Sequence, residues 1–328
     1  AAAFAILSGG VMETGVVTRG GAAPAFAADA RFLVYSITKS FLAAAALRLV
    51  AAGEMELDAP VSRWLPPLPV SPMITLRQLL RHTSGLGDYG GLPDYHAAVR
   101  RGDEPWSDAE FLRRTGNGEP LVPPGTGWAY SNVGYMLVRC LLEAVRASPY
   151  GEVLEVEIFR PLALRHTSVP TRADDLAALT FGPSAYLGGE DGPVAVAGRY
   201  HPRWVAHGVV ASTAAEVARF YRALLEGELL PEPLIAEMCD PIVLGGPIPG
   251  RPVVRPGYGL GIQIDTGAIP GPVYGHTGAG PGASASAVHL RDRGGPVTVV
   301  VLSNGEDVPQ VEWMAAGALA AAAAPRSG

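Results

Sequence analysis

Lysine is the residue that this sequence most lacks. The chain of 328 residues has 25 basic side chains, and only one of them, Lys39, is a lysine. Arginine can replace lysine at most solvated positions, but it cannot lose a proton near neutral pH, whereas a partly desolvated lysine can. A single lysine retained in a chain that otherwise uses arginine therefore indicates a chemical role for its amine.

Other scarcities exclude whole classes of protein. Two cysteines cannot form a disulfide framework, and neither they nor the seven histidines show a metal-ligand spacing, so we expect no metal. A net charge of −6 without a basic stripe argues against nucleic-acid binding. The longest apolar run, 315–324, is too short and too alanine-rich to span a membrane. No glycine-rich nucleotide loop follows a strand and no Gly-x-Ser-x-Gly motif is present, so we expect no cofactor and no α/β-hydrolase fold.

The order of expected elements favours an α/β (α+β) fold. Strands are predicted near both ends of the chain, and helices dominate the middle. We therefore predict one antiparallel sheet domain, 1–57 with 205–328, flanked by terminal helices, and an inserted, mainly helical domain, 58–204. The strands are expected at 3–10, 11–20, 258–264, 273–277, 284–290 and 297–302. Helices are expected at 36–52, 75–81, 107–115, 133–147, 213–226, 234–238 and 309–324, and loops at 87–104 and 165–204.

Ser36 and Lys39 form the first candidate motif. They stand three residues apart at the start of an apolar helical run, so the lysine amine can reach the serine hydroxyl. Serine is a poor nucleophile until a base accepts its proton, and a lysine with a lowered pKa can be that base. The alternative is that Ser36 only caps the helix, because serine is common at helix starts.

Two further short motifs follow later in the chain. Tyr130-Ser131-Asn132 precedes a predicted helix, and His276-Thr277-Gly278 ends a predicted strand. Each has an ordinary explanation, the first as a helix cap and the second as a strand end before a glycine turn. Neither motif alone establishes chemistry.

In this order and at these separations the three motifs resemble the serine β-lactamase and penicillin-binding DD-peptidase superfamily. The similarity is closer to the branch of class C β-lactamases, low-molecular-weight DD-peptidases and class VIII esterases. It covers nearly the whole chain and includes segments 57–61, 79–86, 208–213 and 275–282. The resemblance implies the fold predicted above and a serine enzyme that forms an acyl-enzyme.

The resemblance also implies a role for each motif residue. Ser36 would be the nucleophile, with Lys39 and Tyr130 sharing the work of base and acid, and the sequence leaves open which of the two takes the first proton. Asn132 would hold the lysine amine and the substrate. The strand residues His276, Thr277, Gly278 and Ala279 would bind substrate, and the N–H groups of Ser36 and Ala279 would bind the oxyanion.

His276 departs from the Lys-Thr-Gly motif of typical β-lactamases, whose cation attracts the β-lactam carboxylate. A neutral imidazole is a weaker anion anchor. We therefore expect an esterase or a DD-peptidase or amidase-type hydrolase acting on a small ester, amide or peptide. A class C-like β-lactamase, a biosynthetic transacylase and a non-catalytic penicillin- or peptide-binding sensor remain alternatives. Secreted and cytoplasmic locations both stay open, as does the oligomeric state.

Residues outside the motifs carry weaker signals. His207, next to Gly208, is a second departure from the family pattern; it could shape substrate choice if it lines the cleft, but base rates favour a surface-loop position. His82 follows an apolar helix and is expected to be structural. The loop aromatics Tyr89, Tyr95 and Trp204 could line a cleft rim, but ordinary packing is the simpler expectation.

Overall fold

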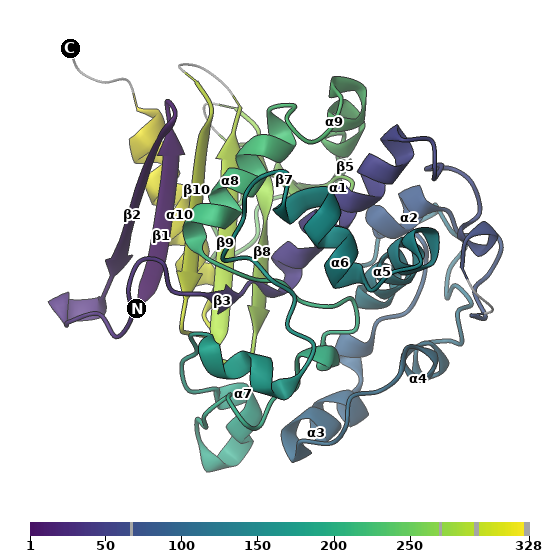
Figure 1. Ribbon diagram of the computed structural model, residues 1–328, viewed down its shortest axis with the longest axis horizontal. Helices are drawn as coiled ribbons and strands as arrows, with labels where there is room; N and C mark the ends of the chain where they lie inside the picture. Colours follow the sequence, from purple (N-terminus) through teal and green to yellow (C-terminus); the bar gives the residue numbers. More distant parts are fainter. Residues whose placement is uncertain (66–67, 269–270, 292–294, 325–328) are drawn as a thin grey trace.

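One large antiparallel sheet organises the protein. The structure, a computed structural model, describes residues 1–65, 68–268, 271–291 and 295–324. Eight strands lie in the order β2-β1-β10-β9-β8-β7-β6-β5, so the two ends of the chain meet where β1 pairs with β10 (Figure 1). The predicted fold class, a mixed α/β protein with a sheet built from both termini, is confirmed.

Each of the six predicted strands has a counterpart in the structure, but the sequence did not predict the short strands 32–33, 211–212 and 242–243, and one prediction is divided in two. The predicted strand 258–264 is two short strands, joined by a turn at Gly261 with φ +82°. A Cβ at Gly261 would lie 2.3 Å from the Cβ of Ala43, so the turn also brings the sheet against a central helix. The strands are β1 (Ala2–Ser8), β2 (Val11–Val17), β5 (Ile242–Val243), β6 (Pro256–Tyr258), β7 (Gln263–Asp265), β8 (Val273–Gly280), β9 (Ala283–Leu290) and β10 (Val297–Ser303), with β3 (Phe32–Leu33) and β4 (Ala211–Ser212) in a separate pair.

The helices contain two corrections. The predicted loop 87–104 includes a helix, α3 (Pro93–Arg101), which begins at a proline and ends at the left-handed Gly102, the ordinary start and stop signals. The predicted loop 165–204 includes the short helix α7 (Ala185–Gly188). The remaining α-helices are α1 (Thr38–Ala51), α2 (Leu76–Leu80), α4 (Asp108–Arg114), α5 (Asn132–Arg146), α6 (Tyr150–Leu154), α8 (Ala214–Leu225), α9 (Glu232–Met238) and α10 (Val308–Ala323).

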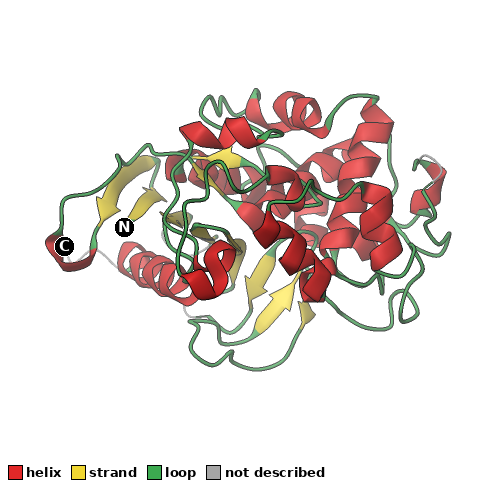
Figure 2. Ribbon diagram, turned by 90° about the horizontal axis from the view of Figure 1, so that it is seen from below, coloured by secondary structure: helices red, strands yellow, loops and turns green. Residues whose placement is uncertain are grey.

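Helices cover both faces of the sheet. The helix α8 lies on one face, against β10 and β1, and the C-terminal α10 lies on the other, against β9 and β10 (Figures 1 and 2). The strand β10 serves both layers because its side chains alternate: Val300 packs into the main core on the α8 side, and Val299 packs with Val311 of α10. The sheet is therefore buried on both sides at its centre.

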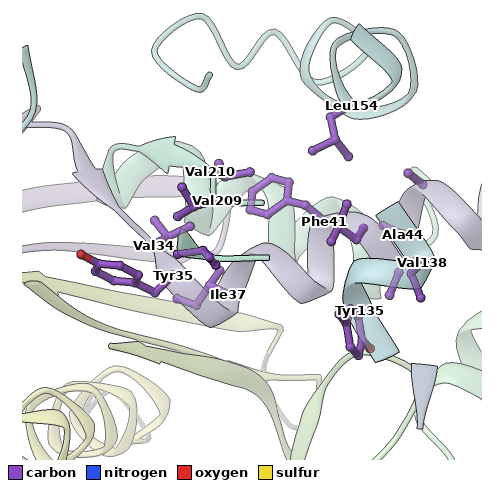
Figure 3. Packing of buried hydrophobic residues seen from close by; sticks show 14 of the residues in the cluster. Val34, Tyr35, Ile37, Phe41, Ala44, Tyr135, Val138, Leu154, Val209 and Val210 are labelled. Atoms are coloured by element: carbon purple, nitrogen blue, oxygen red, sulfur yellow. The ribbon is translucent and has the colours of Figure 1, made fainter. Parts of the chain in front are cut away.

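The helix α1 runs through the centre of the main core. Its residues are buried from Thr38 to Leu47, and in Figure 3 Phe41 and Ala44 lie among side chains from α5, α6 and the segment before β4. Phe41 stacks on Phe220 of α8 with a centroid separation of 3.7 Å. An apolar helix buried on every side holds its first turn rigidly, and that turn follows Ser36 directly.

The predicted domain boundaries, 1–57 with 205–328 and 58–204, stay a prediction. The last predicted boundary, residue 328, lies outside the described residues. Among the described residues between β2 and β5, none belongs to a strand of the large sheet, which is consistent with a helical insertion. Within the described ranges, no helix is long and apolar enough to cross a membrane.

Candidate active site

Ser36 lies on a short 3-10 turn, η2 (Tyr35–Ile37), immediately before α1. Tyr35 has φ 44°, a left-handed conformation that is uncommon for a residue with a side chain. The strand β8 and the turn after it hold this conformation, because the Tyr35 hydroxyl donates to the Pro281 carbonyl at 2.7 Å and its ring packs against Gly280. The strained turn leaves Ser36 half-buried at the wall of a cavity of about 330 Å³.

Lys39 lies beneath Ser36 with no exposed surface. Its Nζ is 3.2 Å from Ser36 Oγ, 2.8 Å from Asn132 Oδ1 and 3.2 Å from His207 Nε2. None of these partners carries a negative charge, and within the described part of the chain Lys39 forms no salt bridge. Burial therefore lowers the pKa of Lys39 well below its usual value, and the more distant Asp88 only partly opposes the shift. A neutral amine next to a serine hydroxyl can accept its proton.

Asn132 is held in place by Asp88, a residue that the sequence did not single out. The Asp88 carboxylate accepts from the Asn132 backbone N–H at 2.7 Å and from its side-chain Nδ2 at 3.3 Å. With Nδ2 directed at Asp88, the amide oxygen Oδ1 faces Lys39. Ser131, rather than Asn132, caps the helix α5, by accepting from Gly134 N at 3.0 Å.

Tyr130 also lies next to the Lys39 amine. Lys39 Nζ is 4.8 Å from the Tyr130 ring centroid. Burial raises the pKa of the Tyr130 phenol, and an interaction with the Ser36 side chain acts in the opposite direction. Tyr130 is thus a neutral phenol at ordinary pH, which can donate a proton. The buried His82 supports it, since the two rings lie 4.3 Å apart and His82 Nδ1 accepts from Ser131 N.

The strand β8 closes the site opposite Lys39. It pairs with β7 only as far as Gly275, so beyond that residue its outer edge is open toward the serine turn. Thr277 N donates outward from this edge to Gln263 Oε1 at 3.2 Å. Backbone N–H groups two residues apart on a strand point the same way, so the Ala279 N–H also points out of the ladder.

Gly278 allows this close approach. A Cβ at position 278 would lie 2.1 Å from the Val34 carbonyl oxygen and 3.0 Å from Ser36 N. Any larger residue would push the strand and the nucleophile apart. The close approach therefore brings β8, with Ala279 next to Gly278, against the backbone at Ser36.

His276 is buried and fully hydrogen-bonded. Its Nδ1 contacts the Thr277 carbonyl at 2.6 Å and its Nε2 contacts the Tyr258 hydroxyl at 3.0 Å. Nδ1 must carry the proton, because a carbonyl only accepts. Burial, and then the charge of Lys39, lower the pKa of His276 to about 3. The side chain is therefore uncharged at ordinary pH.

The expectation that His207 is a surface residue is wrong. Only 2% of its surface is exposed, and it lies at the base of the cavity against Lys39. Tyr89 and Tyr95 also line the cavity, whereas Trp204 is buried against Tyr95.

The sequence reasoning missed Asp88, did not connect His82 with the site, and ranked a place in the cleft for His207 below a surface position. Asp88 lies in a stretch that showed only a glycine- and tyrosine-rich composition, so no signal separated it from its neighbours. Among the residues that the structure describes, no cluster of three or more His, Cys, Asp or Glu side chains could hold a metal ion.

Comparisons with known proteins agree with this geometry. The model of a family described as Beta-lactamase matches residues 2–324. A penicillin-binding protein of Bacillus subtilis (strain 168) is 26% identical over 86% of this chain and 62% of its own length. Esterase EstB of Burkholderia gladioli is 34% identical over 42% of this chain and 38% of its own length. The chain thus spans less than two thirds of either relative. A solved structure of a D-stereospecific amidohydrolase from Streptomyces sp. superposes with a TM-score of 0.79 and 33% identity, covering 93% of this chain and 89% of that one.

Proposed function

The chain belongs to the beta-lactamase family, and from that premise we propose that it is a serine hydrolase that opens esters or amides through an acyl-enzyme on Ser36. One observation carries the proposal. The only lysine of the chain is fully buried without a carboxylate partner, and its Nζ lies 3.2 Å from Ser36 Oγ. Esterase and amidohydrolase relatives support the reaction class.

The proposed acylation begins with Lys39. Ser36 Oγ bonds to the substrate carbonyl carbon while its proton moves to the neutral amine of Lys39. The Ser36 and Ala279 N–H groups bind the oxyanion that forms. As the intermediate collapses, the bond to the leaving group breaks and the Tyr130 phenol gives that group its proton, which the Lys39 ammonium replaces. Water then attacks the acyl-enzyme and releases the acid. The raised pKa of Tyr130 supports Lys39 as the first base.

The charges around the cavity support a preference for acyl groups without a carboxylate. His276 is neutral, so β8 lacks the cation that would attract such a group. The described residues that line the cavity include the carboxylate of Glu306 and no arginine. The Glu306 carboxylate oxygens accept only from neutral donors among the described residues. These donors are Ser184 Oγ and the backbone N–H groups of Ala185, Tyr186 and Gly282. A negative substrate would meet a like charge there.

Intact mass spectrometry tests the proposal. The wild-type protein and Ser36→Ala are mixed with p-nitrophenyl acetate, quenched in acid during turnover and weighed, while p-nitrophenol release is followed. We expect an acetyl adduct and steady release with the wild type, and neither with Ser36→Ala. Benzylpenicillin, which carries a carboxylate, should be consumed much more slowly. Equal turnover by Ser36→Ala would overturn the proposal.

A further inference from the structure

The contact between His207 and Lys39 has no role in the reaction described above. His207 lies in the segment before β4, far from the three motifs in sequence, and its Nε2 is 3.2 Å from Lys39 Nζ. Its other ring nitrogen, Nδ1, is buried and has no hydrogen-bond partner among the described residues. The imidazole also lines the cavity next to Ser36.

Counting the protons of Lys39 shows what this contact can do. A neutral amine has two N–H donors and one lone pair. Asn132 Oδ1, an acceptor only, takes one N–H at 2.8 Å. If His207 Nε2 accepts the second, the lone pair is left for the Ser36 hydroxyl. If Nε2 instead carried a proton, it would donate to that lone pair and compete with Ser36 for it. The state with the proton on Nδ1 is therefore the competent one.

Two other buried histidines show how a structural imidazole is held in this protein. His289 contacts Thr298 Oγ1 through Nδ1 and Glu226 Oε1 through Nε2, and both ring nitrogens of His276 also have partners. His207 and His82 each leave one buried ring nitrogen without a hydrogen-bond partner among the described residues, and of these two His207 is the one that contacts Lys39 Nζ and lines the cavity next to Ser36.

We propose that His207 is a positioning residue for acylation: by accepting one N–H of Lys39, it directs the amine lone pair at Ser36. The proposal rests on the proposed function of Ser36 and Lys39. The proton does not pass through His207 in this scheme. The imidazole acts on the substrate only through the lysine.

The groups around this pair favour a neutral imidazole. Burial, followed by the charge of Lys39, lowers the pKa of His207 well below its usual value. His276, His82 and Arg139 face it from β8, from the end of α2 and from α5, and each acts in the same direction. Asp88 is the acidic group that acts on Lys39, and Tyr130 lies on the far side of the amine. His207 can therefore accept a hydrogen bond across the working pH range.

Two substitutions of similar volume separate positioning from packing. His207→Leu fills the space without an acceptor, whereas His207→Gln keeps an oxygen that can accept from Lys39. We expect His207→Leu to lower kcat for p-nitrophenyl acetate by roughly 10- to 100-fold with little change in KM, because a displaced base costs rate rather than binding. His207→Gln should recover most of this loss.

The pH profile gives a readout that a structural role would not move. An acceptor stabilises the ammonium form of Lys39 more than the amine, so its loss should move the acid limb of kcat/KM to lower pH by about half a unit or more in His207→Leu. The limb should return toward the wild-type position in His207→Gln.

The outcomes are distinguishable. Activity of His207→Leu within about two-fold of the wild type would overturn the positioning role. So would a His207→Gln variant that is no better than His207→Leu, with the acid limb unmoved in both. Ser36→Ala is measured beside them. If it loses all turnover while His207→Leu keeps it, only the positioning role falls, and if Ser36→Ala keeps turnover, the proposed function falls with it.

Discussion

The two ends of helix α1 each hold a basic side chain but treat its charge in opposite ways. In the last turn, Arg48 Nε donates to Glu157 at 2.9 Å, and Arg146 donates to the other oxygen of the same carboxylate at 2.7 Å. In the first turn, the polar groups that Lys39 Nζ contacts in the described part of the chain, Ser36, Asn132 and His207, carry no negative charge. A buried carboxylate thus compensates the two arginines at the C-terminal end, whereas no carboxylate of the described residues pairs with the lysine at the N-terminal end.

The helix dipole increases this difference. The C-terminal end of a helix favours a cation, and the N-terminal end disfavours one. Arg48 therefore sits where its charge is stabilised by both the dipole and Glu157. Lys39 sits where burial and the dipole both disfavour the charge, so its amine is available as a base. In the proposed mechanism, the basic side chain without a carboxylate partner carries out the chemistry, and the paired one belongs to the scaffold.

Exchanging lysine and arginine at the two ends of α1 should have the largest effect on activity, and at one end only. Lys39→Arg places a permanently protonated group beneath Ser36, so the rate of p-nitrophenyl acetate hydrolysis should fall by about 10³-fold or more. The matched exchange at the other end, Arg48→Lys, keeps a charge beside Glu157 and should leave kcat nearly unchanged. Initial rates and circular dichroism of both variants check this. A Lys39→Arg protein with a tenth of the wild-type rate would contradict the assignment of the base.

Removing the compensating charge at the C-terminal end should affect stability rather than activity. Glu157 is 6% exposed, and Glu157→Gln would leave Arg48 and Arg146 without an anion. Because both arginines are about a third exposed, we expect a loss of about 2–3 kcal/mol in the free energy of unfolding, below the range for fully buried pairs. Urea denaturation measures the loss. The kcat of the folded variant at 25 °C should be unchanged, and a large fall in kcat would mean that the two ends are coupled.

The pH dependence of the free energy of unfolding should also distinguish the two ends of α1. Burial lowers the pKa of Lys39 in the folded state, so between that pKa and the ordinary value of 10.5 the unfolded chain binds a proton that the folded chain does not. The free energy of unfolding of the wild type, relative to Lys39→Met, should therefore rise with pH through this window, by up to about 1.4 kcal/mol per pH unit. The matched variant Arg48→Met should show no such slope, because arginine stays protonated. Urea denaturation at several pH values measures both differences.

The pH profile of activity should follow the protonation of Lys39. The rate should fall as pH drops through the lowered pKa of Lys39, because protonation removes the base. No second transition is expected near pH 6.5, since burial keeps the pKa of His276 at about 3 and that of His207 well below its usual value. A clear transition near 6.5 that disappears in His207→Gln would contradict the neutral imidazole.

A smaller change, in substrate preference, should come from introducing a cation on β8 near the N-terminal end of α1. His276→Lys would place an ammonium on β8 near Lys39, where it can attract a carboxylate. We expect the ratio of kcat/KM for carboxylate-bearing to neutral esters to rise several-fold, the effect of one partly solvated charge pair. Matched succinyl and butyryl p-nitrophenyl esters measure the ratio. An unchanged ratio would show that position 276 does not act on the substrate.

Much of the fold could be read from the sequence, because its signals are local. The alternating strands near both ends and the long apolar helix after Ser36 were predicted in type and near their observed bounds. The spacing of Ser107 and Glu110 at the start of the predicted helix 107–115 is typical of a capping box, but only half of one forms: Ser107 accepts from Glu110 N, while the Glu110 carboxylate pairs with Arg113 and Arg114. The difference has a physical reason, since two arginines on the same helix compete for the carboxylate.

The candidate site shows the same difference between features with a local sequence signal and features that depend on the fold. The pairing of Ser36 with Lys39 follows from three residues of helical spacing, so the sequence alone determined it. The contributions of Asp88, His82 and His207 depend on segments that meet only when the chain folds, and no local pattern marks them.

The sequence by itself determined which residue types this site contains: one lysine in helical reach of a serine, a tyrosine and an asparagine before a helix, and a histidine where related motifs have a lysine. Only the tertiary structure decided their charge states. The pKa of Lys39 depends on the side chains packed around it from α5, β8 and the segment before β4, and those neighbours are remote in sequence. The same long-range packing brought His207 to the amine, because burial and hydrogen bonding are properties of the folded surroundings rather than of the chain.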